Sequence, residues 1–352
     1  MTSIKNIFKN YTVPCVFLIL GIIGFFIADL PIKMFINDII ERISRNFFIV
    51  LSLIIPIMAG MGINFALTVG AMAGQLALIF VVILNISGTL GVFTAFLISL
   101  PISAIFGIFI GLIMNRTKGR EMITGLILGY FFSGIYQLII LSIPVSNSVI
   151  GVEGGRGVKS TIDLGIIKYG LDRFPTYIRI FGIKLPLFTL IICSMLCLFI
   201  WYFSKTKLGQ DIRLTGMDIK TAEEKGINVN KVRIIAIVLS TIFAGIGQII
   251  SLQNIGTLST FGSHEQVSMY AGASILVGGA SIKKAGCMNA FIGTLLFYIL
   301  FIVAPKSGTN IFGDPQIGEF FRVFIAYGVI VFALIINNKK NKSYWQMSIC
   351  PI

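Results

Sequence analysis

The stretch TGMDIKTAEEKGINVNKVR, residues 215–233, is polar and charged, and it lies between two strongly apolar runs. LFTLIICSMLCLFIWYF occupies residues 187–203, and IIAIVLSTIFAGIGQII occupies residues 234–250. Apolar runs of this length are typical of segments that contact lipid or lie in a large protein core. A helix that crosses a bilayer needs about 20 apolar residues. The stretch is therefore interpreted as a polar segment between two membrane spans.

The whole chain has this apolar character. Its 352 residues are 56% hydrophobic and 12% charged, with a mean hydropathy of +0.94, whereas soluble domains are about 25% charged. The runs are too long for strands and lack two-residue alternation, so we expect an all-α, polytopic helical membrane protein. About ten transmembrane segments (8–10) are expected, near residues 13–29, 47–66, 68–86, 89–114, 122–143, 185–204, 231–252, 269–282, 285–304 and 319–337. The eighth is short and glycine-rich, as in a broken or re-entrant helix.

The lysines and arginines predict the orientation of these spans. With the N-terminus in the cytoplasm, the inside segments hold 17 of the 28 basic residues and five acids, and the outside segments hold 11 basic residues and nine acids. The net charge is then +12 inside and +2 outside, as the positive-inside rule requires. We expect both termini in the cytoplasm, a long external loop at 144–184 and a cytoplasmic loop at 205–230.

The cytoplasmic loop contains residues that delimit a short helix. Asp218 is a good N-cap for a helix over 219–225, Gly226 can adopt the left-handed conformation that ends it, and Asn230 can cap the next helix. A simple connection needs only about four to six residues. Two interpretations stay open: a solvated helix at the membrane surface, or a docking element for a soluble partner.

The loop also carries a resemblance to a known family. LGQDIRLTGMDIKTAEEKGINVNKVRIIAIVLSTIFAGIGQ, residues 208–248, is similar to the cytoplasmic coupling loop of permease subunits in ATP-binding-cassette importers. The most similar branch serves simple sugars, nucleosides and branched-chain amino acids. Thr221 stands where that family usually has the first of two adjacent alanines. The matching positions are Leu208, Gly209, Arg213, Gly216, Ala222, Gly226, Ile227, Asn228, Lys231, Ala244 and Gly245.

Two further stretches extend the resemblance over residues 47–337. ASILVGGASIKKAGCMNAFIGTLLF, residues 273–297, is similar to the family's Gly-Gly turn, basic residue, glycine and span of small residues. GMGINFALTVGAMAGQ, residues 60–75, lies where the family has its glycine-rich second and third spans. Asn64 and two extra residues before Gly70 depart from the ribose-type pattern. The resemblance therefore does not identify the substrate.

The resemblance implies a single permease domain over 1–352 in a bacterial cytoplasmic (inner) membrane, with no enzymatic activity and no cofactor. The implied partners are a cytoplasmic ATP-binding subunit, a second permease copy or paralogue, an external substrate-binding (lipo)protein and membrane lipid; nucleic acid is not expected. The implied ATPase-coupling residues are Gly209, Arg213, Gly216, Asp218, Thr221, Ala222, Gly226, Ile227, Asn228 and Lys231. The glycine-rich stretch 151–160 lacks phosphate-loop spacing, because Val158 separates Gly157 from Lys159.

Polar residues within the apolar runs are candidates for a solute pathway, because polar groups are costly in a membrane. Phe65 is added because its ring could stack on a ring-shaped substrate. Each amide has an alternative role as a hydrogen-bonding contact between helices. The candidates are Asn64, Phe65, Gln75, Asn85 and Gln248.

These observations predict the permease subunit of an ATP-driven importer for a small polar solute, with a simple sugar or a nucleoside favoured. The alternative is an ATP-independent secondary transporter or channel. We expect His264 in an external turn, and a proton-coupled carrier would need an Asp, Glu or His within a span. No metal site is expected, because Cys193 and Cys197 share a helix face without a histidine or carboxylate nearby.

Overall fold

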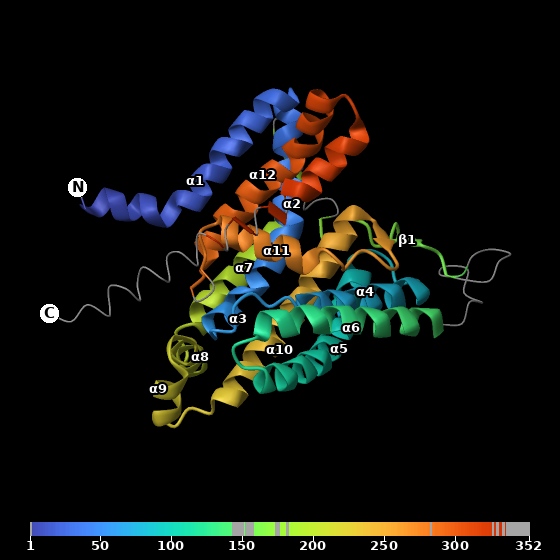
Figure 1. The fold of residues 1–352 in the computed structure, drawn as a ribbon. Coiled ribbons are helices and arrows are strands. Elements are labelled where there is room, and N and C mark those ends of the chain that lie inside the picture. Colours follow the sequence, from blue (N-terminus) through green and yellow to red (C-terminus); the bar gives the residue numbers. More distant parts are fainter. Residues whose placement is uncertain are drawn as a thin grey trace.

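The computed structural model describes residues 2–142, 151, 158–172, 177–180, 183–281, 284–325, 327–328, 331–332 and 335. The fold is helical, as predicted (Figure 1). The helices are α1 (Thr2–Ala28), α2 (Ile32–Ser52), α3 (Ile54–Met58), α4 (Leu67–Ile83), α5 (Gly88–Arg116), α6 (Glu121–Ser142), α7 (Leu187–Phe203), α8 (Lys207–Met217), α9 (Ile219–Glu224), α10 (Val229–Ile255), α11 (Val267–Val277) and α12 (Cys287–Phe312). Residues 315–325 are also helical.

Within the described residues, four helices are long and apolar enough to cross a membrane: α5, α6, α10 and α12. A fifth span results if α7 and α8, which meet at a 77° bend, are taken together. The larger number of about ten spans, and the cytoplasmic position of both termini, stay predictions. The helix α11 has 11 residues, or roughly 16 Å at 1.5 Å per residue, which is too short to cross, as its glycine-rich run indicated.

Helix α2 begins at Ile32, 15 residues before the span expected at 47–66. The charged residues Asp38, Glu41 and Arg42 interrupt the apolar run in the sequence, but a helix accommodates them on a polar face. Helix α2 ends at Ser52, and α3 continues the path after one residue. The apolar run therefore marked only the buried half of a longer helix.

Helix α10 lies at the centre and packs against α5, α4 and α2. Small residues permit this close packing. A Cβ at Gly70 or Gly74 of α4 would overlap backbone carbonyl oxygens of α10, and one at Gly107 of α5 would lie 2.9 Å from the Val238 Cα. Gly70 and Gly74, four residues apart on α4, and Gly107 on α5 thus have a structural role, because they let α4 and α5 pack closely onto α10.

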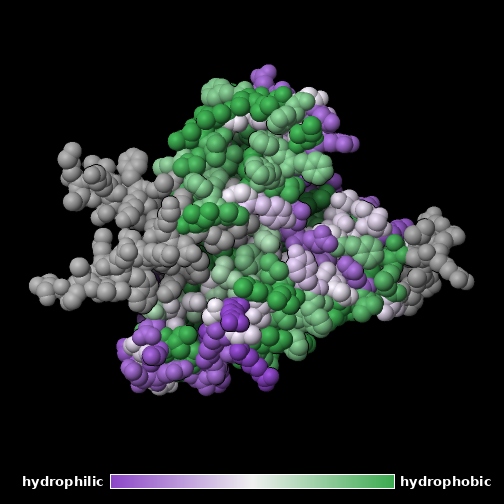
Figure 2. Space-filling model, viewed as in Figure 1, coloured by the Kyte–Doolittle hydropathy of each residue, from purple (hydrophilic) through white to green (hydrophobic). Residues whose placement is uncertain are grey.

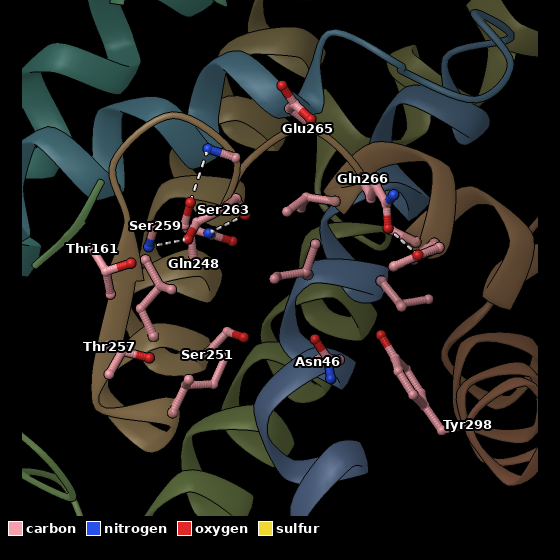
Figure 3. A pocket seen from close by; sticks show the side chains of 18 residues that line it. Asn46, Thr161, Gln248, Ser251, Thr257, Ser259, Ser263, Glu265, Gln266 and Tyr298 are labelled. Carbon is pink, nitrogen blue, oxygen red and sulfur yellow. Dashed lines mark hydrogen bonds between the residues drawn. The ribbon is translucent and has the colours of Figure 1, made fainter. Parts of the chain in front are cut away.

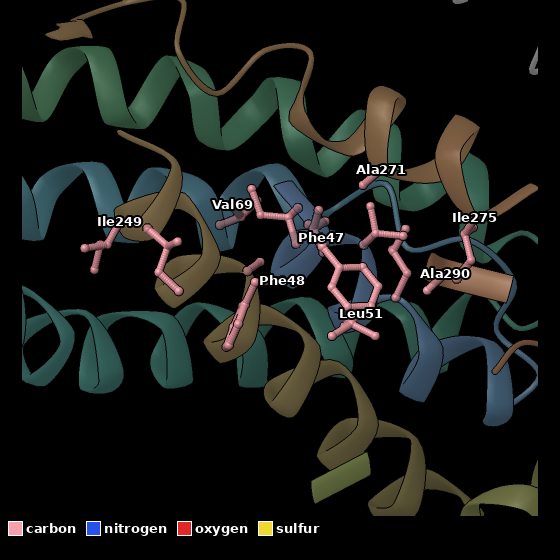
Figure 4. Packing of buried hydrophobic residues seen from close by; sticks show 14 of the residues in the cluster. Phe47, Phe48, Leu51, Val69, Ile249, Ala271, Ile275 and Ala290 are labelled. Atoms are coloured by element: carbon pink, nitrogen blue, oxygen red, sulfur yellow. The ribbon is translucent and has the colours of Figure 1, made fainter. Parts of the chain in front are cut away.

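The buried half of α2 supplies the aromatic part of the core (Figure 4). Phe47, Phe48 and Leu51 are each at most 8% exposed. They lie among apolar residues of α4, α10, α11 and α12, such as Val69, Ile249, Ala271, Ile275 and Ala290. Burial of a Phe or Leu side chain contributes about 1.5–3 kcal/mol, so this cluster holds helices together that are far apart in the sequence.

Short strands were not expected, but the described residues include four. β1 (Thr161–Asp163) pairs with β4 (Thr257–Ser259), and β2 (Tyr177–Ile180) pairs with β3 (Ile183–Pro186), both antiparallel. Strands of three or four residues show no periodicity in a sequence. The β1–β4 pair joins the segment 144–184, part of which lies outside the described residues, to the connection between α10 and α11.

The polar connections lie at two separate ends of the molecule. Helices α8 and α9 lie together at one end, whereas β1 lies at the other (Figure 1). The first of these ends is strongly hydrophilic on the face shown in Figure 2, next to apolar helix surfaces. This separation of polar ends by apolar helices is what a membrane-spanning chain requires.

Candidate functional site

The expected coupling segment begins at the bend between α7 and α8. Thr206 caps α8: its hydroxyl accepts a hydrogen bond from the Gly209 amide at 3.2 Å. Gly209 lies against the end of α7, where a Cβ would overlap the Phe203 carbonyl oxygen. The bend therefore requires a residue without a side chain at position 209.

Helix α8 then crosses the end of α3. Gly216 makes the crossing possible, because a Cβ there would overlap the Met58 carbonyl oxygen and lie 2.7 Å from the Gly60 amide nitrogen. Arg213 of α8 is exposed. The glycines of the motif thus fix α8 against the membrane-embedded part of the chain and leave its charged side chains outside.

The short helix α9 has the N-cap that the sequence predicts. The Asp218 carboxylate accepts hydrogen bonds from the Lys220 amide at 3.1 Å and from the Thr221 hydroxyl at 2.6 Å. These two hydrogen bonds, the side-chain one first, hold the pKa of Asp218 below its ordinary value. Thr221, which differs from the alanine usual in the family, therefore strengthens the cap.

The end of α9 also follows the prediction in part. Gly226 has a positive φ of 75°, and the Ile227 amide donates to the Ala222 carbonyl at 3.0 Å. The prediction that Asn230 caps the next helix is wrong: Asn228 does so, accepting from the Lys231 amide at 3.1 Å. The left-handed Gly226 reverses the chain early, so α10 starts at Val229 and Asn230 lies inside its first turn.

Only one face of α9 is free to contact another protein. Ala222 is fully buried against the chain itself, so it positions α9 and cannot be a contact residue. Met217, just before α9, is 65% exposed although it is apolar. We call the exposed surface formed by the following residues the α9 face: Met217, Lys220, Glu223, Glu224 and Lys225.

A buried ion pair follows directly after the coupling segment, and the sequence interpretation missed it. Arg233 of α10 pairs with Glu121 at the start of α6, with side chains 2% and 10% exposed. Nearby, the Asn115 side-chain amide donates to the Asn230 carbonyl at 2.8 Å. The first turn of α10 is thereby connected to the corner between α5 and α6. Two opposite charges, each at the edge of an apolar run, were the available signal.

One candidate of the solute pathway, Phe65, lines a cavity of about 230 Å³, called here the Phe65 cavity. Its walls come mainly from the residues around the start of α4, from α6, from the connection between α10 and α11 and from the start of α11, and include Thr68, Ser133 and Met269. It combines an aromatic ring with hydroxyl groups, which suits a small polar ring-shaped solute.

A second candidate, Gln75, lies behind this cavity in contact with His264. The His264 Nδ1 is 3.1 Å from the Gln75 Oε1, and its Nε2 is 3.0 Å from the Ser133 hydroxyl. The ring packs edge-on against Tyr136. His264 lies in the connection between α10 and α11, as expected, but it is only 1% exposed. A turn in the sequence therefore places its histidine in the interior.

Acidification is expected to destabilise this arrangement. Burial lowers the pKa of His264 from 6.5 to about 4, so at pH 5 the unfolded chain binds a proton that the folded chain excludes. Stability is then complete above pH 6.5 and falls as the pH approaches 4. The loss at pH 5 is about 2 kcal/mol, measurable as a lower melting temperature than at pH 7.5. The variant His264→Gln should show a flatter pH dependence; an unchanged slope would contradict the assignment.

The remaining candidates lie elsewhere. The Asn64 amide donates to the Ser240 hydroxyl of α10 at 3.3 Å, and its Oδ1 accepts from the Ala66 amide at 3.1 Å. Asn64 is thus a buried contact between helices. Asn85 is exposed after the end of α4, with a positive φ of 54°, as asparagine often is at a helix terminus. The structure brings neither residue to the Phe65 cavity.

Gln248 lines a larger, separate cavity of about 570 Å³, called here the Gln248 cavity (Figure 3). It lies between α2, α10, α11 and α12, beside β1 and β4, and includes Asn46, Ser251 and Tyr298. The two cavities have only Glu265 and Gln266 in common. Among the described residues, no group of three or more His, Cys, Asp or Glu could hold a metal ion.

Comparison with known proteins relates this arrangement to transport. Residues 35–335 match the family described as "Branched-chain amino acid transport system / permease component". The ribose import permease protein of Escherichia coli (strain K12) is 24% identical over 244 residues, which cover 69% of this chain and 68% of that protein. The galactose/methyl galactoside import permease protein of the same strain is 25% identical over 256 residues, 72% of this chain and 68% of that protein.

A nucleoside ABC transporter permease protein of Lactococcus lactis subsp. cremoris (strain MG1363) is 24% identical over 271 residues, 70% of this chain and 79% of that protein. The family match extends from the start of α2, through the coupling segment, to the helical residues that follow α12. The apolar helices α5, α6, α10 and α12 agree with the membrane location of such proteins. The chain therefore belongs to the permease-component family of the branched-chain amino acid transport system, and is a multi-pass protein of the bacterial cytoplasmic membrane.

Proposed function

We propose that this chain is the membrane-embedded subunit of an ATP-driven importer for a small polar solute, a simple sugar or a nucleoside. The observation that carries the proposal is α9: a short helix capped at both ends, fixed by buried Ala222 and bearing an exposed, charged face. A helix of six residues is not stable in isolation. Such a structure is well suited to transmit a push from a soluble partner.

The proposed push would travel through the contacts of the coupling segment. Helix α9 is joined to α8, which crosses α3 at Gly216, and to α10, which Asn228 caps. The Arg233–Glu121 pair then links α10 to α6, a wall of the Phe65 cavity. Movement of α9 would thus reach the proposed solute pathway through closely packed elements and switch it between inward and outward openings.

Four partners complete the proposed importer. A cytoplasmic ATP-binding subunit docks on the α9 face and supplies the ATPase activity. A second permease copy or a paralogue completes the pathway, and lipid covers the apolar helices. An external substrate-binding protein docks on the segments 144–184 and 253–268; in their described residues, β1 of the first segment pairs with β4 of the second.

The proposed pathway uses the Phe65 cavity, with Phe65 as a stacking surface and Gln75 behind it. Both are neutral and suit an uncharged solute. Asn64 has a supporting role in this proposal, because both ends of its amide make internal hydrogen bonds. Asn85 has no role in it.

The test is co-purification of the chain with the ATP-binding subunit of the same organism. We expect the triple variant Met217→Arg, Glu223→Lys, Glu224→Lys to insert and melt like the wild type, because these residues are exposed. The amount of ATP-binding subunit that co-purifies with this variant should be at least about tenfold lower than with the wild type, because like charges facing each other across an interface cost several kcal/mol. The control Lys306→Glu, an exposed charge reversal outside the coupling segment, should retain wild-type amounts. Full retention by the triple variant would exclude the α9 face as the docking site.

The alternative function, an ATP-independent secondary transporter or channel, is kept because of His264. A buried histidine in contact with a buried glutamine is the kind of group that a proton-coupled carrier uses. Solute uptake by reconstituted chain without any ATP-binding subunit, driven by a pH gradient and lost in His264→Gln, would favour this alternative. Uptake that needs both the ATP-binding subunit and ATP would favour the importer.

A further inference from the structure

We infer that the Gln248 cavity is a second solute-binding site, separate from the proposed pathway, for a neutral polyhydroxylated molecule such as a pentose ring. The cavity has about 570 Å³, within the range of about 300–1,000 Å³ that small-molecule sites occupy. Its walls come from α2, α10, α11 and α12 and from the β1–β4 pair, so several packed elements form it and not one loop.

The chemistry of the walls sets the class of ligand. Hydroxyl groups and side-chain amides provide most of the polar lining, and they lie around the cavity in Figure 3. They include Asn46, Thr161, Gln248, Ser251, Thr257 and Ser263. Such groups both donate and accept hydrogen bonds, as the hydroxyl groups of a sugar ring do. Tyr270 and Tyr298 add aromatic faces on which an apolar ring face can pack.

Two of the residues that carry these groups, Gln248 and Ser251, are largely buried and have a side-chain oxygen free to bind. Gln248 is 2% exposed, and its side-chain amide nitrogen donates to the Ser263 carbonyl at 3.1 Å. Its Oε1 accepts no hydrogen bond from the described part of the chain. Ser251, 7% exposed, likewise has no hydrogen-bond partner among the residues that the structure describes. Both residues line the cavity, and neither oxygen is among the fully enclosed polar atoms without a partner, so both oxygens are open to a ligand that enters the cavity.

The remaining contacts hold these groups in place before a ligand arrives. The Tyr270 hydroxyl donates to Gln266 Oε1, and the Ser259 amide donates to the Ser263 hydroxyl at 2.9 Å. On the α2 side, the Asn46 amide donates to the Arg42 carbonyl at 2.9 Å. A site whose side chains are already positioned loses less entropy on binding.

The charges around the cavity argue against an anionic ligand. Glu265 is the charged residue in the lining, and it would repel a phosphate or carboxylate. Arg42 and Arg322 lie behind the tyrosines, over the Phe301 ring at 5.3 and 4.7 Å. Arg322 also pairs with Glu319 at 2.6 Å. Neither arginine lines the cavity.

The inference rests on the proposed function in one respect, because it takes the bound solute to be the transported solute. Binding itself needs no ATPase. The full-length chain in lipid nanodiscs, without any partner subunit, is titrated with D-ribose, adenosine and ribose 5-phosphate by calorimetry. We expect ribose or adenosine to bind. Tighter binding of ribose would indicate a free pentose as the ligand, and tighter binding of adenosine would indicate a nucleoside. Ribose 5-phosphate should bind at least tenfold more weakly than the better of these two.

Two variants locate the binding. Ser251→Leu fills the Gln248 cavity and should weaken binding at least tenfold at an unchanged melting temperature, since Ser251 makes no internal hydrogen bond within the described residues. Gln248→Leu should also weaken binding. Lys306→Glu, an exposed charge reversal outside both cavities, should leave it unchanged. Absence of binding, or binding that keeps its wild-type strength in Ser251→Leu, would overturn the inference. Co-purification of the ATP-binding subunit would still support the proposed function in that case.

Discussion

Replacement of Arg233 by methionine is expected to lower the free energy of unfolding by about 3–5 kcal/mol. The side chains of Arg233 and Glu121 are 2% and 10% exposed, and each is the other's charged partner. Methionine leaves the Glu121 carboxylate buried without a counter-charge, which costs more than the pair itself contributes. The measurement is an unfolding titration in mixed detergent micelles, followed by circular dichroism of the helices.

Two further variants give this prediction its controls. The double variant Arg233→Met, Glu121→Gln removes both charges and should recover much of the loss, because no buried charge remains. The pair Arg322–Glu319 is a matched comparison on the surface, with side chains 29% and 56% exposed. Glu319→Gln should cost less than about 1 kcal/mol. If Arg233→Met cost no more than Glu319→Gln, the buried pair would not have the structural weight assigned to it.

The local parts of the coupling segment could be predicted from the sequence. Asp218 and Gly226 cap α9 through contacts with residues at most three positions away, and local contacts of this kind follow from residue type and spacing. The N-cap of α10 shows the limit of such local predictions, because Asn230 was predicted and Asn228 is the cap. Both are good capping residues, and the choice depends on where the chain leaves the left-handed turn at Gly226.

The interior polar contacts could not be predicted in the same way. His264 is buried by Gln75 and Ser133, which are 189 and 131 positions away, and no local pattern reports such a contact. The sequence predicted five pathway candidates but not their separation. Phe65 and Gln248 line different cavities, and Asn85 ends a helix. A polar residue within an apolar run indicates that the residue has a specific role. The tertiary packing decides whether that role is to line a cavity, to connect helices or to end a helix.

The second large effect is expected at Gly293, where α12 crosses α11. A Cβ at this position would overlap the Ser274 carbonyl oxygen and lie 2.7 Å from the Gly278 amide nitrogen. The atoms in the way are backbone, which cannot rotate aside as a side chain can. We therefore expect Gly293→Ala to separate the two helices and to cost about 3 kcal/mol or more, seen in the same unfolding titration.

A glycine in a comparable helix provides the control for Gly293. Gly134 lies in the interior of α6, is exposed, and has no atom within 4 Å of a Cβ placed on it. Gly134→Ala should therefore be neutral or stabilise the chain by up to about 1 kcal/mol, the difference in helix propensity between the two residues. If Gly→Ala lowers the free energy of unfolding at Gly293 but not at Gly134, the loss at Gly293 comes from close packing and not from helix propensity. Equal effects would mean that α11 and α12 do not meet as closely as described.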